Sequence, residues 1–217
     1  MAQEHPALMR TFTYILLLLV TATYPAGFDV STVMTPTERK LVEAGETITH
    51  QRPSPEGRGL TYEVLGEVLT TKEHLLRVLM DYENYPEFMS TVSKVSIVSQ
   101  TEAGTTLNFF LALPFGLEKK YRTVIQLVES DSLSARLEWK QVEWPGLSPK
   151  ETLRDTQGYW LIHEMGPSRL FLIYHVFSDP GSIPFGLSWA LEPISKSNVT
   201  GVFRATRSWA ETTSLDR

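Results

Sequence analysis

The stretch that decides the fold is Tyr174-His175-Val176-Phe177-Ser178-Asp179-Pro180-Gly181-Ser182-Ile183-Pro184. It begins as a strand and ends at a turn that contains Pro180 and Gly181. After this turn, the apolar residues follow helical spacing as far as the C-terminus. The apolar stripe of that helix is formed by Val199, Val202, Phe203, Thr206, Trp209 and Ala210. A meander of strands followed by a long amphipathic helix indicates a curved sheet that grips the helix and leaves an apolar cavity beside it.

Composition limits the classes of function. The chain has 217 residues, of which 42% are hydrophobic, enough for one globular domain with a substantial core. Its net charge of −5 and its lack of a basic cluster argue against binding to nucleic acid or to anionic lipid headgroups. Since there is no cysteine, disulfides, thiol chemistry and cysteine zinc sites are excluded.

The N-terminus resembles an export signal. The apolar run Phe12–Val20 follows Arg10 and is shorter than the roughly 20 residues of a membrane span. Small residues between Thr21 and Ala26 offer cleavage positions. We therefore expect a signal peptide over residues 1–26 and a mature protein that is exported, either periplasmic or secreted. A short buried helix is the alternative.

Residues 27–59 precede the ligand-binding domain. Thr35 is a helix cap before Pro36, and Gly45 ends the short helix that follows. Residues 51–59, with two prolines and two glycines, are expected to form a loop. We assign residues 27–59 to an N-terminal helix and linker, and residues 60–212 to a ligand-binding domain.

Within that domain, the pattern predicts an α+β fold with an antiparallel sheet. A first strand covers Leu60–Leu69, a helix begins after the cap Thr71, and Pro86 separates it from a second helical turn. Six further strands are expected at residues 91–99, 105–113, 118–129, 133–140, 152–164 and 169–177. The long helix follows them.

Three stretches carry a resemblance to a known family. They are Asp81–Met89, with its aspartate, aromatic, proline and aromatic order, Gly158-Tyr159-Trp160, and Tyr174–Pro184. Their order and spacing resemble the START-like (SRPBCC, helix-grip) superfamily, which includes START lipid transfer domains, coenzyme Q-binding proteins and aromatic polyketide cyclases. The resemblance covers about Leu60–Glu211.

The resemblance implies a ligand between the C-terminal helix and the concave face of the sheet. Access is expected near the loops around Phe115, Trp144 and Phe185. Because the superfamily has no shared catalytic motif, no catalytic residue is carried over. We expect neither a cofactor nor a metal, since the sequence has no His-x-x-x-His pair and no carboxylate cluster.

The candidate ligand-binding residues lie on the predicted strands and on the segment after them. They are Phe109, Leu111, Tyr121, Thr123, Ile125, Trp139, Trp160, Tyr174, His175, Phe185, Trp189, Val202 and Phe203. For any single aromatic residue in this set, packing in the hydrophobic core is an alternative to ligand binding. Tyr174 and His175 are strand neighbours and cannot both face inward, and the sequence does not decide between them.

Three functions remain open. The first is an exported carrier of a hydrophobic small molecule (lipid, sterol, quinone or polyketide), with transient membrane contact through the apolar loop 111–117. The second is a cyclase or dehydratase on the same fold, using His175 with Arg122 or Tyr121. The third is a protein-interaction module whose cavity is filled by its own side chains. The oligomeric state is left open.

Overall fold

The computed structural model describes residues 32–54, 57–113, 116–181 and 191–214. They form an eight-stranded antiparallel sheet of order β1-β2-β8-β7-β6-β5-β4-β3. The strands are β1 (Ile48–Arg52), β2 (Leu60–Val68), β3 (Val92–Thr101), β4 (Gly104–Leu113), β5 (Leu117–Ser130), β6 (Ser134–Val142), β7 (Asp155–Gly166) and β8 (Arg169–Asp179). The helices are α1 (Pro36–Glu43), α2 (Lys72–Met80), the 3-10 turn η3 (Tyr82–Asn84), α3 (Tyr85–Phe88) and α4 (Leu191–Ser214).

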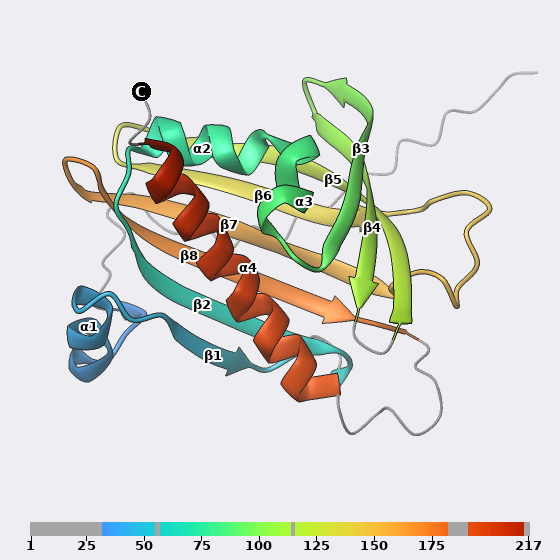
Figure 1. Cartoon of the computed structure of the whole chain (residues 1–217), viewed down its shortest axis with the longest axis horizontal. Helices are drawn as coiled ribbons and strands as arrows, with labels where there is room; N and C mark the ends of the chain where they lie inside the picture. The colour runs from blue at the N-terminus through green and yellow to red at the C-terminus, as the bar shows by residue number, and fades with distance from the viewer. Residues whose placement is uncertain (1–31, 55–56, 114–115, 182–190, 215–217) are drawn as a thin grey trace, which may run out of the picture.

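The helices cover the two faces of the sheet unequally. Figure 1 shows α4 crossing the concave face, with α2 and α3 beside it and α1 set apart next to β1. The main core lies between this concave face and the helices. A smaller core on the convex face joins Met34 and Val42 to Leu65, Phe171 and Ile173. The predicted α+β architecture, a curved sheet around a long C-terminal helix, is confirmed.

The short helices begin where the sequence predicts. Thr35 and Glu38 form a capping box at the start of α1, with the Glu38 amide donating to the Thr35 hydroxyl at 3.2 Å. The Thr71 hydroxyl accepts from the His74 amide at the start of α2. Pro86 lies in the first turn of α3, where its missing amide hydrogen removes no helical bond.

Strand β1 was not predicted. Residues 48–50 were assigned to the linker and residues 51–52 to the loop, yet all of them pair with β2, from Ile48 opposite Leu65 to Arg52 opposite Thr61. The segment has one large apolar residue and no alternation, so its strand conformation comes from pairing with β2 rather than from its own pattern. The side chain of Arg52 also holds the strand through Glu63.

The helix α4 approaches the sheet most closely at Gly66 of β2. A Cβ atom at this position would lie 2.9 Å from Cε1 and 3.0 Å from Cζ of the Phe203 ring. Phe203 is fully buried, so its ring has no free space to move into. The absence of a side chain at Gly66 therefore sets how deeply the helix sits in the sheet.

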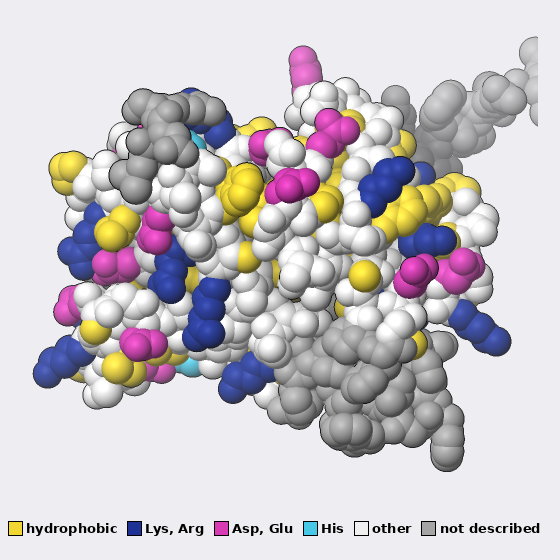
Figure 2. Space-filling model, in the orientation of Figure 1, with side chains coloured by type: hydrophobic (Ala, Val, Ile, Leu, Met, Phe, Trp, Pro, Cys, Tyr) yellow, Lys and Arg dark blue, Asp and Glu magenta, His cyan; other side chains and the backbone are white. Residues whose placement is uncertain are grey.

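Two further features concern the surface charges and the apolar character of the helices. Figure 2 shows basic and acidic side chains interleaved on one face of the molecule rather than gathered into a patch of one sign. Within the described ranges, no helix has the length and apolar character needed to cross a membrane.

Substitution of Gly66 tests this packing. Gly66→Ala forces the Phe203 ring away and is expected to lower the free energy of unfolding by about 1–3 kcal/mol, as overpacked cores do. The control is Gly201→Ala on α4, where an added Cβ meets nothing within 4 Å. It is expected to raise stability by up to about 1 kcal/mol through helix propensity. Urea denaturation of the full chain measures both, and equal stability of Gly66→Ala and the parent chain would contradict the packing argument.

Candidate functional site between the sheet and α4

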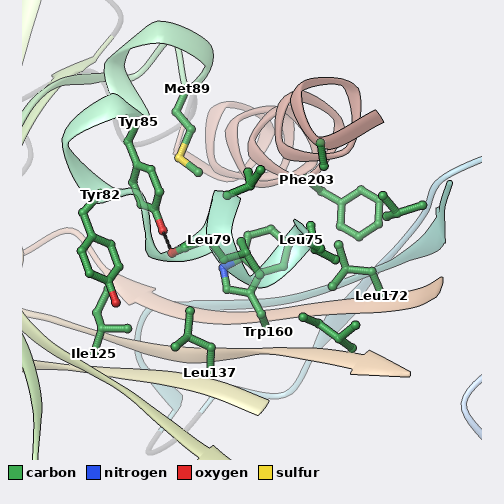
Figure 3. Packing of buried hydrophobic residues seen from close by; sticks show 14 of the residues in the cluster. Leu75, Leu79, Tyr82, Tyr85, Met89, Ile125, Leu137, Trp160, Leu172 and Phe203 are labelled. Carbon is green, nitrogen blue, oxygen red and sulfur yellow. Dashed lines mark hydrogen bonds between the residues drawn. The ribbon is translucent and has the colours of Figure 1, made fainter. Parts of the chain in front are cut away.

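One end of the concave face is solidly packed. Around the β5–β6 and β7–β8 turns, the inward side chains have almost no exposed surface, and α2 covers them with Leu75 and Leu79. The strand residues here are Val68, Leu137, Ile162, Leu170 and Leu172. Figure 3 shows this packing, with Leu75 and Leu79 directed at Trp160 and with the Tyr85 hydroxyl donating to the Leu79 carbonyl at 2.5 Å. We call this the closed end.

The opposite end of the same face is only half-filled. Toward the β4–β5 and β6–β7 connections, Tyr121, Trp139 and Tyr174 pack against the core yet keep part of their surface accessible. Burial raises the pKa of both Tyr121 and Tyr174 well above the ordinary range, so protein atoms surround these hydroxyls. Because these side chains lie deep in the fold and keep accessible surface, we infer a hollow beside them. We call this the open end.

Helix α4 and β4 complete the open end. Val199 and Val202 of α4 and Leu111 of β4 are also half-buried and pack against the same core. Phe203, fully buried, marks the boundary with the closed end. The open end is therefore lined by apolar and aromatic surface on both sheet and helix, as small-molecule sites usually are.

Aromatic contacts stiffen the wall of the hollow. Trp160 stacks on Tyr174 with ring centroids 4.0 Å apart, and Trp139 meets Tyr174 at 5.6 Å. A Cβ on Gly158 would lie 2.4 Å from Cζ2 of Trp139, so the glycine lets the indole lie against the strand. This contact gives a physical reason for the Gly-x-Trp spacing at Gly158–Trp160.

Two uncharged polar side chains on this inward face each have a buried oxygen without a hydrogen-bond partner. Thr123 of β5 and Gln141 of β6 are directly opposed across the strand pair, on the face that also carries Tyr121 and Trp139. The Thr123 hydroxyl and the Gln141 carbonyl oxygen are both buried and make no hydrogen bond. Gln141 uses its amide nitrogen to donate to the Leu153 carbonyl at 3.0 Å.

A separate pocket opens at the rim of this end. It has a volume of about 500 Å³ and lies between the β6–β7 connection and the start of β7, with Gln141, Trp144, Leu153 and Asp155 among its lining residues. Trp144 was expected near the access to the cavity, and it does lie on this rim. Gln141 belongs both to the rim pocket and to the inward face of β6.

Comparisons with known proteins agree with this geometry. No protein-family model and no curated protein sequence matches the chain. Among solved structures, a STAR-related lipid transfer protein fragment from Xanthomonas axonopodis matches with a TM-score of 0.66 and 15% identity, covering 76% of this chain and 93% of that one. Human STARD10 matches with a TM-score of 0.66 and 18% identity, covering 78% and 71%. The ZhuI aromatase/cyclase from a Streptomyces species matches with a TM-score of 0.57 and 17% identity, covering 75% and 94%.

The chain has the START-like, helix-grip fold. The superfamily resemblance carried by Asp81–Met89, Gly158–Trp160 and Tyr174–Pro184 is thus confirmed at the level of fold. At these identities the likeness establishes the architecture and not a ligand.

Most of the predicted site residues lie on the inner surfaces of this START-like fold. They are Phe109, Leu111, Tyr121, Thr123, Ile125, Trp139, Trp160, Tyr174, Val202 and Phe203. Ile125 is buried directly opposite Trp139 in the β5–β6 pair. Phe185 and Trp189 lie outside the described residues. Gln141 was missed because the predicted strand ended at residue 140, although it continues the alternation of Leu137 and Trp139.

His175 does not line the hollow. It stacks on Tyr159 with centroids 4.9 Å apart on the convex face, and its Nδ1 lies 3.7 Å from the Glu63 carboxylate. The register places His175 opposite Tyr159, and the β7–β8 pairing has an irregularity between Glu164 and Gly166. Tyr174 is therefore the inward residue of the pair, and the expectation of His175 in the cavity is corrected.

The residues considered for catalysis are also separated. Arg122 donates to the Asn108 carbonyl oxygen at 2.8 Å and lies over the Trp144 ring at 5.2 Å. As the strand neighbour of Tyr121 and Thr123, it points to the opposite face. Neither His175 nor Arg122 thus shares the hollow with Tyr121. Among the described residues, no group of three or more potential ligands is arranged to hold a metal.

On the convex face, Glu63 links three neighbouring strands. It lies on β2 between Arg52 of β1, whose Nε donates to it at 3.1 Å, and His175 of β8. Burial acts to raise the pKa of Glu63, but His175 and Arg52 together outweigh it and lower the pKa to about 2. The charged form of Glu63 is therefore the one that fits the folded protein.

The pH dependence of stability follows from this shift. Since the folded pKa of Glu63, about 2, lies below the ordinary value of 4.5, its contribution is complete above pH 4.5 and is lost as the pH falls toward 2. We expect Glu63→Gln to lose about 1–3 kcal/mol at pH 7, because Arg52 is left without its partner.

The variant should also show a flatter stability curve than the parent between pH 4.5 and pH 2. Urea unfolding at several pH values measures this difference, with Glu102→Gln in the exposed β3–β4 turn as the control. Parallel curves for Glu63→Gln and the parent would rule out the assigned role of Glu63.

Proposed function

We propose that this protein is an exported START-like carrier that binds one hydrophobic small molecule between the concave face of the sheet and α4. The observation that supports it most directly is the contrast between the two ends of that face. The closed end is filled by the protein's own side chains, whereas Tyr121, Trp139 and Tyr174 at the open end keep accessible surface. A ligand would cover that surface.

The physical driving force is removal of apolar surface from water. Burial is worth about 25 cal/mol per Å², so a ligand that loses roughly 300 Å² of apolar surface gains roughly 7 kcal/mol before the entropic cost of association. The half-buried rings of Tyr121, Trp139 and Tyr174 supply the apolar surface for this burial. Lipids, sterols, quinones and polyketides are all consistent with such a wall.

Two other functions are less well supported. Solved structures of the same fold include a STAR-related lipid transfer protein and an aromatase/cyclase. A cyclase-type enzyme needs acid or base groups beside the substrate. Of the residues predicted for this role, His175 and Arg122 lie on the convex face, and Tyr121 alone faces inward. An interaction module with a filled cavity would leave no half-buried inward residues at the open end.

Export remains part of the proposal. Its support is the sequence of residues 1–26, which lie outside the described residues. Expression with the native N-terminus should yield an extracellular or periplasmic protein whose mass corresponds to cleavage between about residues 20 and 26. Full-length mass in the cytosolic fraction would contradict export and would leave the binding proposal unaffected.

Filling the hollow tests the binding proposal. Val202→Phe on α4 adds a ring at the open end, so we expect it to weaken binding of the neutral dye Nile red by at least about tenfold. Ser208→Phe adds the same ring on the exposed side of α4 and should leave binding unchanged. Fluorescence titration measures the affinities, and native mass spectrometry of the same samples reveals co-purified cargo. Absence of both dye binding and bound mass, or equal binding by Val202→Phe, would refute the site.

A further inference from the structure

Thr123 and Gln141 lie opposite each other, and their unpaired oxygens limit which polar group a ligand can place between them. Both residues lie on the inward face of the open end, and they are direct cross-strand neighbours in the register of β5 and β6. Such neighbours have Cβ atoms about 5 Å apart. The Thr123 hydroxyl and the Gln141 carbonyl oxygen are both buried and unpaired. A buried polar atom without a partner costs about 1–3 kcal/mol, so two together call for an explanation.

The orientation of the Gln141 amide is fixed. Its Nε2 donates to the Leu153 carbonyl at 3.0 Å, and a carbonyl accepts only from a donor, so the oxygen must point away from Leu153. The unpaired Gln141 oxygen can accept a hydrogen bond but cannot donate one. The unpaired Thr123 hydroxyl can do both. The pair therefore presents one acceptor and one donor on adjacent strands.

A single alcohol group satisfies both residues. Its hydrogen is donated to the Gln141 oxygen, while its own oxygen accepts from the Thr123 hydroxyl. An ether or ketone satisfies only Thr123, because it has no hydrogen to donate. A carboxylate also only accepts, and its negative charge would face the Gln141 oxygen.

The surroundings of the pair are nearly free of charge. Among the described residues, the inward positions at this end of β5 to β8 carry one charge, that of Lys119. Its ammonium already donates to the Lys150 carbonyl at 2.9 Å and to the Thr152 carbonyl at 3.1 Å. The hydroxyls of Tyr121 and Tyr174 stay protonated, since burial raises the pKa of each. Lys119 is therefore held by two carbonyls, and Thr123 and Gln141 themselves offer an ionic headgroup no charged partner.

We infer that the cargo is an uncharged alcohol whose hydroxyl binds between Thr123 and Gln141 while its apolar body lies against Tyr121, Trp139 and Tyr174. This inference rests on the proposed function and names the class of molecule that the same hollow takes. The two oxygens have no accessible surface of their own. The alcohol reaches them when a half-buried neighbour on the same face, Tyr121 or Trp139, turns aside.

Three probes with the same dodecyl chain compare an alcohol, an ether and a carboxylate as the polar group. Dodecan-1-ol, 1-methoxydodecane and dodecanoate compete with Nile red for the full chain, freed of co-purified cargo, at pH 7.5. The alcohol should bind about tenfold more tightly than the ether, which loses one hydrogen bond. It should bind at least about tenfold more tightly than dodecanoate, which also brings an unpaired charge into the hollow. Equal affinities for the three probes would overturn the inference.

Two variants locate the preference. Thr123→Val keeps the shape of the side chain and removes its hydroxyl, and Gln141→Leu removes the acceptor. Each should bring the alcohol close to the affinity of the ether, while binding of Nile red is retained. The matched control is Thr106→Val, because Thr106 pairs with Val124 on the opposite face of the sheet and should keep the full preference. Should Gln141→Leu not fold, Thr123→Val carries the test.

The outcomes distinguish this inference from the proposed function. If Nile red binds and Val202→Phe blocks it, but either Thr123→Val or Gln141→Leu keeps the alcohol preference, the carrier function stands and the alcohol site is wrong. If neither Nile red nor any of the three probes binds, the proposed function fails and the inference falls with it.

Discussion

The contact between Gly66 and Phe203 determines most of what the concave face can do. Because Gly66 has no side chain, the Phe203 ring reaches the backbone of β2 and also comes within 6.2 Å of Trp160. The helix is thereby held deep in the sheet at one point along its length. On one side of this point α2 and α4 seal the core, and His74 and Glu211 tie the end of α4 to its neighbours. On the other side the same helix covers aromatic residues without filling the space above them.

Successive side chains on the central strands alternate between the concave and the convex face of the sheet, which differ in character. On β8, Tyr174 contributes to the uncharged hollow, while His175 belongs to the charged cluster around Glu63. On β5, Thr123 faces inward, while Arg122 lies over Trp144. The charged cluster around Glu63 holds β1, β2 and β8 together on the convex face. The concave face does not contribute to these ion pairs. Charge therefore stabilises the sheet from the convex face, and Lys119 is the one charge at the described inward positions of the open end of β5 to β8.

Much of this arrangement could be predicted from local signals. The caps Thr35 and Thr71, the break at Pro86 and the alternation of β5 and β6 all act within a few residues, and the corresponding elements are found close to where they were expected. Strand β1 could not be foreseen, because its residues carry no strand pattern and depend on β2 as a partner. The face taken by His175 depends on how β8 pairs with β7, which no local signal reveals. Gln141 was missed for a smaller reason, since β6 runs two residues beyond its predicted end.

The unequal filling of the concave face has a consequence for the life of the protein. At the closed end, strand β2, strands β6 to β8, helix α2 and the last turns of α4 pack into one core. This core forms without a ligand. Its cooperative stability belongs to the chain alone. A carrier of the kind proposed can therefore reach its native topology while empty, take up cargo later and release it without unfolding. Folding and loading become separate events, which is what a carrier that passes through repeated rounds of uptake and delivery requires.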